Sequence, residues 1–103
     1  MPQVTIADWL NELETTELPQ CHRGAGSNKM PCALSLAVLM SGEHVQQSSL
    51  PTTRAFELLG GLVEGEETPL AAALREVYRW NDRDNLTFKE IAARFRKTYP
   101  EFI

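Results

Sequence analysis

The sequence predicts a mainly α-helical fold, a single compact domain over residues 1–103 with about five short helices. Apolar residues recur at helical spacing in several segments, and clusters of Gly, Pro, Asn and Ser separate those segments. The composition, 43% hydrophobic and 23% charged, is ordinary for a globular protein and sufficient for one modest core. We expect β-structure only in short pieces, such as a small hairpin near residues 20–31.

The first two predicted helices lie on either side of a turn-rich loop. Thr5 is a suitable N-cap for the first helix, and Leu18-Pro19 ends it. Residues 20–31, QCHRGAGSNKMP, favour a loop or a short hairpin because Gly, Ser, Asn and Pro favour turns. Pro31 suits the first turn of a second, apolar helix, which stops at Ser41-Gly42.

The third predicted helix follows a polar connector over residues 43–51. It begins at Thr52 and ends at Gly60-Gly61, where glycine suits a C-cap. The acidic stretch VEGEE comes next and is expected to form a loop.

Two more helices complete the predicted chain. Thr68-Pro69 opens the fourth helix, which runs to about Trp80. Residues 81–85 are expected to form a turn that the side chains of Asn81 and Asp82 lock through bonds to backbone amides. Thr87 and Glu90 form the Ser/Thr-x-x-Glu pattern of a capping box at the start of the last helix.

Charge and hydropathy argue against nucleic-acid binding and membrane association. A net charge of −4 and a pI near 5.1 disfavour general binding to nucleic acids or anionic membranes. The longest apolar run, Ala33–Met40, is too short to span a bilayer, and the first residues lack the pattern of a signal peptide. Cys21 and Cys32 do not make a disulfide framework. We therefore expect a cytoplasmic protein that contacts neither nucleic acid nor membrane.

Part of the segment 60–82 resembles the Nudix box, the metal-binding motif of a family of nucleotide hydrolases. The residues that match its spacing are Gly61, Glu67, Arg75, Glu76 and Val77. The family needs two further glutamates three and four residues after Glu76, because carboxylates on one helix face hold the metal. Those positions are Arg79 and Trp80, and Asp82 replaces a later glycine. The resemblance therefore implies at most a degenerate hydrolase.

A second set of motifs covers more of the chain. Its segments are Gly24-Ala25-Gly26, Cys32–Leu39, Leu50-Pro51, Leu59-Gly60, Trp80-Asn81-Asp82 and Leu86–Ala92. Together they resemble small uncharacterised phage and prophage proteins, although Ser35 replaces a family glycine and a single Cys32 replaces a frequent double cysteine. This resemblance implies a phage-like origin and a compact helical fold, without a known activity.

Cysteine and histidine residues could in principle form a site. The scattered spacing of Cys21, His22, Cys32 and His44 is not that of a structural zinc centre, so we expect no metal and no cofactor. Cys32 at a helix N-terminus could act as a nucleophile with a histidine as base, or it could be a small buried hydrophobic residue. No complete catalytic set emerges, and we assign no catalytic residue. The sequence thus favours a non-enzymatic protein and leaves an enzyme as an alternative.

Three hypotheses about function follow from these patterns. The first is a phage-type accessory protein that binds a host protein or defence complex stoichiometrically in the host cytoplasm and inhibits it. The second is a degenerate Nudix-like hydrolase that uses Glu67 and Glu76. The third is a domain that sequesters a small nucleotide, with arginines holding its phosphates. The candidate binding residues are Glu64, Glu66, Glu67, Arg75, Arg79, Trp80, Asn81, Asp82 and Arg83. Trp80 is more typical of a core residue or of a hinge between helices than of a stacking platform.

Overall fold

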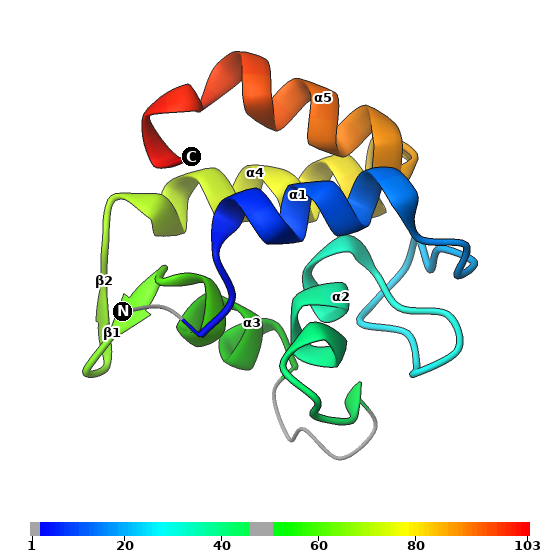
Figure 1. Cartoon of the computed structure of the whole chain (residues 1–103), viewed down its shortest axis with the longest axis horizontal. Helices are drawn as coiled ribbons and strands as arrows, with labels where there is room; N and C mark the ends of the chain where they lie inside the picture. The colour runs from blue at the N-terminus through cyan, green and yellow to red at the C-terminus, as the bar shows by residue number, and fades with distance from the viewer. Residues whose placement is uncertain (1–2, 46–50) are drawn as a thin grey trace.

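Five α-helices make up most of the described chain, as the sequence predicts (Figure 1). The computed structural model describes residues 3–45 and 51–103, so Leu50 of the Leu-Pro motif lies outside the described residues. The helices are α1 (Ile6–Thr15), α2 (Ala33–Met40), α3 (Pro51–Leu59), α4 (Leu70–Asp82) and α5 (Phe88–Thr98), followed by a short 3₁₀ helix, η2 (Pro100–Phe102). Two short strands, β1 (Leu62–Val63) and β2 (Glu66–Glu67), join α3 to α4.

Local capping signals determine where several helices begin and end. The Thr5 hydroxyl accepts a hydrogen bond from the Asp8 amide at the start of α1. Thr87 and Glu90 form both hydrogen bonds of the capping box of α5. At the end of α3, Gly60 has a φ of 93°, and the Gly61 amide donates to the Phe56 carbonyl at 2.7 Å. This is the Schellman pattern that glycine favours, so the predicted caps at Thr5, Thr87 and Gly60 are confirmed. The prediction that Pro31 lies in the first turn of the second helix is wrong, because α2 begins at Ala33 with Cys32 as its N-cap.

The small antiparallel sheet lies at residues 62–67, whereas the sequence suggested a hairpin near residues 20–31. Leu62 pairs with Glu67 and Val63 with Glu66. Glu64 (φ 54°) and Gly65 (φ 80°) form the two-residue turn, and positive φ at both positions is typical of a type I′ hairpin. Residues 20–31 instead contain one isolated antiparallel bridge, between Gly26 and Pro31.

The fourth helix is longer than predicted, because Asn81 and Asp82 belong to α4 and not to the following turn. The reversal of the chain takes place over residues 83–87, where Asn85 adopts a φ of 55°. Asparagine tolerates this left-handed conformation better than most residues do. The prediction of a turn is therefore correct for its second half and wrong for its first two residues.

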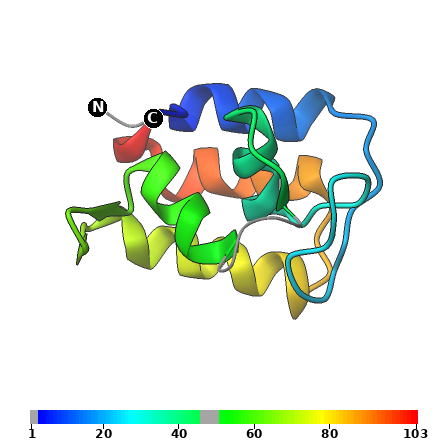
Figure 2. The same ribbon diagram turned by 90° about the horizontal axis from the view of Figure 1, so that it is seen from below.

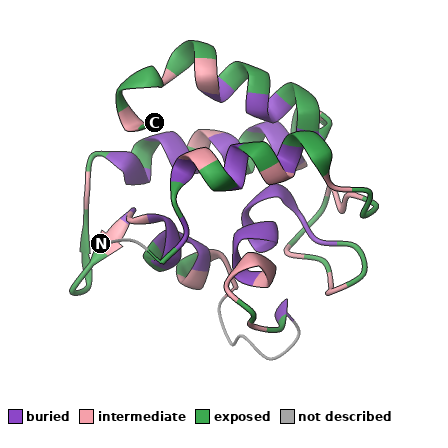
Figure 3. Cartoon of the chain, in the orientation of Figure 1, coloured by how far each residue is buried: buried purple, intermediate pink, exposed green. Residues whose placement is uncertain are grey.

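A single hydrophobic core joins the five helices. Helix α1 packs on α5, and α2 contacts α1, α3 and α4 (Figure 2). Residues 33–38 of α2 are all buried, which explains why this helix is apolar on every side (Figure 3). The Trp9 ring is fully buried, meets Phe95 edge to face at 5.7 Å and donates a hydrogen bond from Nε1 to the Ala33 carbonyl. No helix among the described residues is long and apolar enough to cross a membrane.

An ion pair connects the segment after α2 to α3. Arg54 donates from Nε to Glu43 Oε1 at 2.8 Å and from Nη2 to Glu43 Oε2 at 2.6 Å. This bidentate geometry gives a stronger arginine–carboxylate interaction than a single hydrogen bond does. The hydrogen bonds from Arg54 lower the pKa of the Glu43 carboxyl below its ordinary value.

The lowered pKa of Glu43 predicts that this pair contributes to stability at neutral pH and not in acid. A carboxyl whose pKa is depressed by folding stabilises the protein above its unfolded pKa, and this contribution is lost as pH falls through the folded value. We expect Glu43→Gln to be less stable than the native protein at pH 7, and the difference to shrink as the pH falls below the ordinary glutamate pKa of about 4.3. Urea unfolding across this pH range measures the difference.

The matched control is Glu17→Gln, at an exposed glutamate for which the described structure shows no ion pair. A difference between native protein and Glu43→Gln that stays constant across the pH range would contradict the assigned role of the Arg54 pair.

Candidate functional site

The nine predicted binding residues lie in two separate regions of the structure. One region contains the hairpin and the exposed side of α4, with Glu64, Glu66, Glu67, Arg75 and Arg79. The other is the C-terminal end of α4, with Trp80, Asn81, Asp82 and Arg83. The nine residues therefore do not form one site.

Asn81 is the centre of a buried polar network at the end of α4. Its side chain is 1% exposed. Its Oδ1 accepts hydrogen bonds from the Ala33 amide (2.9 Å) and from Gln20 Nε2 (2.8 Å), and its Nδ2 donates to the Cys21 carbonyl (2.7 Å) and to Asp82 Oδ1 (2.7 Å). The bond to Ala33 satisfies the first amide of α2. The amide group thus ties the loop before α2 to the end of α4.

Neighbouring side chains strengthen this connection. His22 Nδ1 donates to the Asn81 carbonyl oxygen at 2.9 Å, and Gln20 Nε2 also donates to the Leu86 carbonyl at 2.7 Å. Asp82 Oδ2 accepts from the Gly24 amide at 3.2 Å. Asn81 and Asp82 therefore hold a segment that is remote in sequence, instead of locking their own turn as predicted. No sequence pattern indicated that Gln20 and His22 take part.

Trp80 is a core residue, and Arg83 is a surface residue. The Trp80 ring is 6% exposed and stacks on Tyr99 with 6.4 Å between ring centroids. The Arg94 guanidinium lies 5.4 Å from the centre of the Trp80 ring. These contacts favour the packing interpretation of Trp80 over a binding role. Arg83 is exposed at the C-cap of α4.

The cysteines and histidines are engaged in separate contacts. Cys32 is buried and caps α2, since its sulfur accepts a hydrogen bond from the Ser35 amide at 3.3 Å. Burial raises the pKa of the Cys32 thiol, which favours a capping and packing residue over a nucleophile. His44 lies 2.7 Å from the Asn28 side-chain amide. Within residues 3–45 and 51–103, no three His, Cys, Asp or Glu side chains are placed to hold a metal ion.

The hairpin region has an exposed surface of acidic side chains beside an exposed valine. Glu64, Glu66 and Glu67 are exposed, and Val63 beside them is 54% exposed. Glu67 forms an ion pair with Arg75 across the gap between β2 and α4. Arg79 Nη1 lies 3.9 Å from Glu76 Oε2, one turn earlier on α4. Of the predicted residues in this region, the structure thus brings Glu67 and Arg75 into contact.

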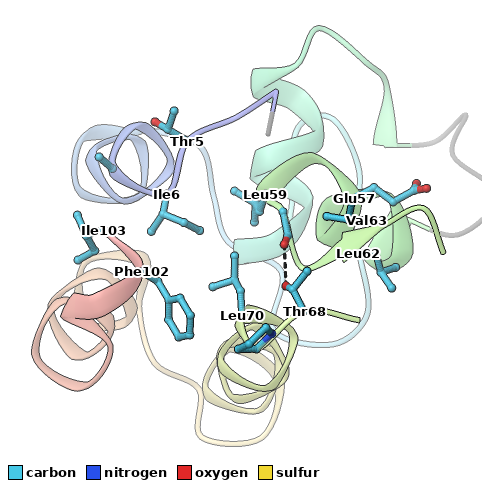
Figure 4. Close-up of a pocket in the computed structure, with 13 residues that line it drawn as sticks. Thr5, Ile6, Glu57, Leu59, Leu62, Val63, Thr68, Leu70, Phe102 and Ile103 are labelled. Carbon is cyan, nitrogen blue, oxygen red and sulfur yellow. Dashed lines mark hydrogen bonds between the residues drawn. The ribbon is translucent and has the colours of Figure 1, made fainter. Parts of the chain in front are cut away.

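Two grooves flank the hairpin. The apolar groove has a volume of about 630 Å³ and lies between the start of α1, the end of α3, the start of α4 and the C-terminal segment (Figure 4). The arginine groove has a volume of about 470 Å³ and lies between α3, the hairpin and α4. Its lining includes Arg75, Arg79, Tyr78 and Phe56, whereas Arg83 is outside it. Leu62 of β1 belongs to both grooves.

The Asn81 network predicts a large loss of stability on truncation of its side chain. Asn81→Ala leaves the Ala33 amide and the Cys21 carbonyl without their partner in a buried place, and each unpaired group is costly. We expect the free energy of unfolding to fall by about 3 kcal/mol, measured by chemical denaturation.

Asp84→Ala is the matched control, because Asp84 is exposed three residues further along and the described structure gives its side chain no hydrogen bond. This control should change the free energy of unfolding by no more than about 0.5 kcal/mol. A loss of under about 1 kcal/mol in Asn81→Ala would show that water or a rearranged loop replaces the amide.

Comparisons with protein-family models, curated proteins and solved structures found no match for this chain.

Proposed function

We propose that this protein acts by stoichiometric binding of another protein through its hairpin face. The hairpin face comprises strands β1 and β2 together with the two grooves beside them. The observation that carries the proposal is the distribution of exposed large hydrophobic residues, which within residues 3–45 and 51–103 are Leu18, Met30, Val63, Tyr78 and Ile103. Three of these five, Val63, Tyr78 and Ile103, are on or beside this one face, where they border or line the grooves. Exposed apolar groups gathered beside a hollow surface are typical of interaction sites.

The hairpin is held firmly in place, which favours binding because little order must be gained on association. The Thr68 amide donates to the Gly61 carbonyl at 2.9 Å, and the Thr68 hydroxyl donates to the Gly60 carbonyl at 2.8 Å. Gly61 lies so close to α4 that a Cβ atom there would be 2.8 Å from Leu74 Cδ1. These contacts fix the base of the hairpin against α4.

The tip of the hairpin is strained in a way that supports a functional role. Glu64 has a positive φ of 54°, a conformation for which Asn or Gly is the usual choice in such turns. An exposed glutamate at this position costs stability, and such costs are often retained at functional sites. Together with Glu66, it makes the tip acidic, which suits a partner with a basic surface.

The sequence resemblance alone supports a proposal about the class of partner. Small phage proteins that bind stoichiometrically commonly act on host proteins, and the motifs of this chain resemble those of phage and prophage proteins. We therefore propose a host protein or defence complex in the host cytoplasm as the target, and inhibition as the outcome.

Capture of a partner tests the proposal. Tagged native protein should retain a specific protein from host lysate, identified by mass spectrometry, and Val63→Glu should lose it because a charge interrupts the apolar part of the face. The control Ala93→Glu places the same charge at an exposed position of α5. The absence of a specific partner, or equal capture by both variants, would contradict the proposal.

A second candidate function is the sequestration of a small nucleotide in the arginine groove. The groove has the size of a small-ligand pocket and contains both arginine and aromatic side chains. Arg79 is suited to hold a phosphate, since its nearest carboxylate oxygen is 3.9 Å away, on Glu76. Arg75 would first have to leave its ion pair with Glu67.

A thermal-shift series without magnesium tests this second candidate. Mono- and dinucleotides should raise the melting temperature of the native protein by several degrees. They should raise the melting temperature of Arg79→Gln by less. Arg83→Gln is the control, because Arg83 is one turn further along α4 and outside the groove. Equal shifts in both variants would contradict binding in this groove. Magnesium-dependent nucleotide turnover that is lost in Glu76→Gln would support the hydrolase alternative instead.

A further inference from the structure

We infer that the apolar groove receives a short amphipathic segment of the partner, in which apolar side chains are flanked by lysine or arginine. This inference rests on the proposed function, because it names the part of the hairpin face that makes the contact and the chemistry that it recognises. It commits to a protein segment as the occupant.

The walls of the groove are apolar and come from distant parts of the chain. Ile6 of α1, Leu59 at the end of α3, Leu70 of α4 and Phe102 of η2 point toward the same hollow (Figure 4). Val63 of β1 stands at the edge of the groove and is half exposed. A hollow of about 630 Å³ holds several side chains of one segment, as in recognition of a peptide or a helix in a groove.

The two threonine hydroxyls in the lining already have partners, which argues against a polar small molecule as the occupant. The Thr68 hydroxyl donates to the Gly60 carbonyl at 2.8 Å, as the dashed line in Figure 4 shows. The Thr5 hydroxyl accepts from the Asp8 amide at 3.1 Å. Contact in this groove is therefore made mainly through apolar surface.

The charged side chains around the apolar groove are negative. Among the described residues that line the apolar groove, Glu57 has a charged side chain, and none of the others is a lysine or an arginine. The Glu57 side chain is 49% exposed, and its ion pair with Arg54 is long, at 3.7 Å. Glu64 and Glu66 lie next to Val63 on the hairpin and are also exposed. An apolar hollow with carboxylates at its edge complements an apolar segment that carries positive charges.

Two synthetic peptides test this inference directly. Both are amphipathic, with the same length and the same leucine positions, and one has lysine while the other has glutamate at the polar positions. The lysine peptide should shift the NMR signals of Ile6, Leu59 and Phe102 of the native protein. It should bind about tenfold more weakly to Glu57→Lys, because an attractive charge becomes a repulsive one.

The control variant is Glu17→Lys, which makes the same change of charge at an exposed position outside the groove and should bind as the native protein does. Equal binding of the lysine and glutamate peptides would overturn the inference. So would signal shifts confined to the arginine groove, self-association of the protein through these residues, or no shifts at millimolar peptide.

The same variants separate this inference from the proposed function. If native protein captures a specific partner from lysate and Glu57→Lys captures it equally well, the groove is not the binding site, although stoichiometric binding stands. If the native protein captures no partner and the lysine peptide still shifts the groove signals, the groove chemistry is supported and the proposed function fails.

Discussion

The side-chain amide of Asn81 is the interaction on which the arrangement of this fold depends. The loop between α1 and α2 has little regular structure of its own, yet α2 must lie in the centre of the core. The Asn81 side-chain amide accepts hydrogen bonds from the Ala33 amide and from Gln20, and it donates one to the Cys21 carbonyl. It therefore fixes both ends of the loop between α1 and α2 against α4. Because buried amide groups must be paired, the network allows few alternative positions for α2. The fold therefore relies on one helix end to position a distant segment.

The N-terminal half of α4 supports the hairpin. Here the close approach of Gly61 to Leu74 and the hydrogen bond of the Thr68 hydroxyl hold the base of the hairpin against α4. The hairpin separates an apolar groove from a groove with two arginines, and its tip is acidic. The Asn81 network thus lies at the C-terminal end of α4, and the hairpin is held beside the N-terminal half of the same helix.

Local patterns predicted the helices well, because helical spacing and caps such as Thr5, Thr87 and Gly60 act within a few residues. They failed for the role of Asn81, since its partners are Gln20, Cys21 and Ala33, separated from it by 48 to 61 residues in sequence. The hairpin was placed too early because Glu-Gly is a weak signal for a type I′ turn, whereas the loop at residues 20–31 is rich in turn-forming residues. Both grooves are assembled from several elements, so no single stretch of sequence could reveal them.

If the hairpin face contacts a partner, as we propose, site-specific photocrosslinking at this face detects the contact directly. A photoreactive amino acid at position 63 should form a covalent adduct with a specific host protein, detected as one larger band and identified by mass spectrometry. The same group at position 93, exposed on α5, should form no such adduct. An adduct from position 93 with none from position 63 would contradict the account.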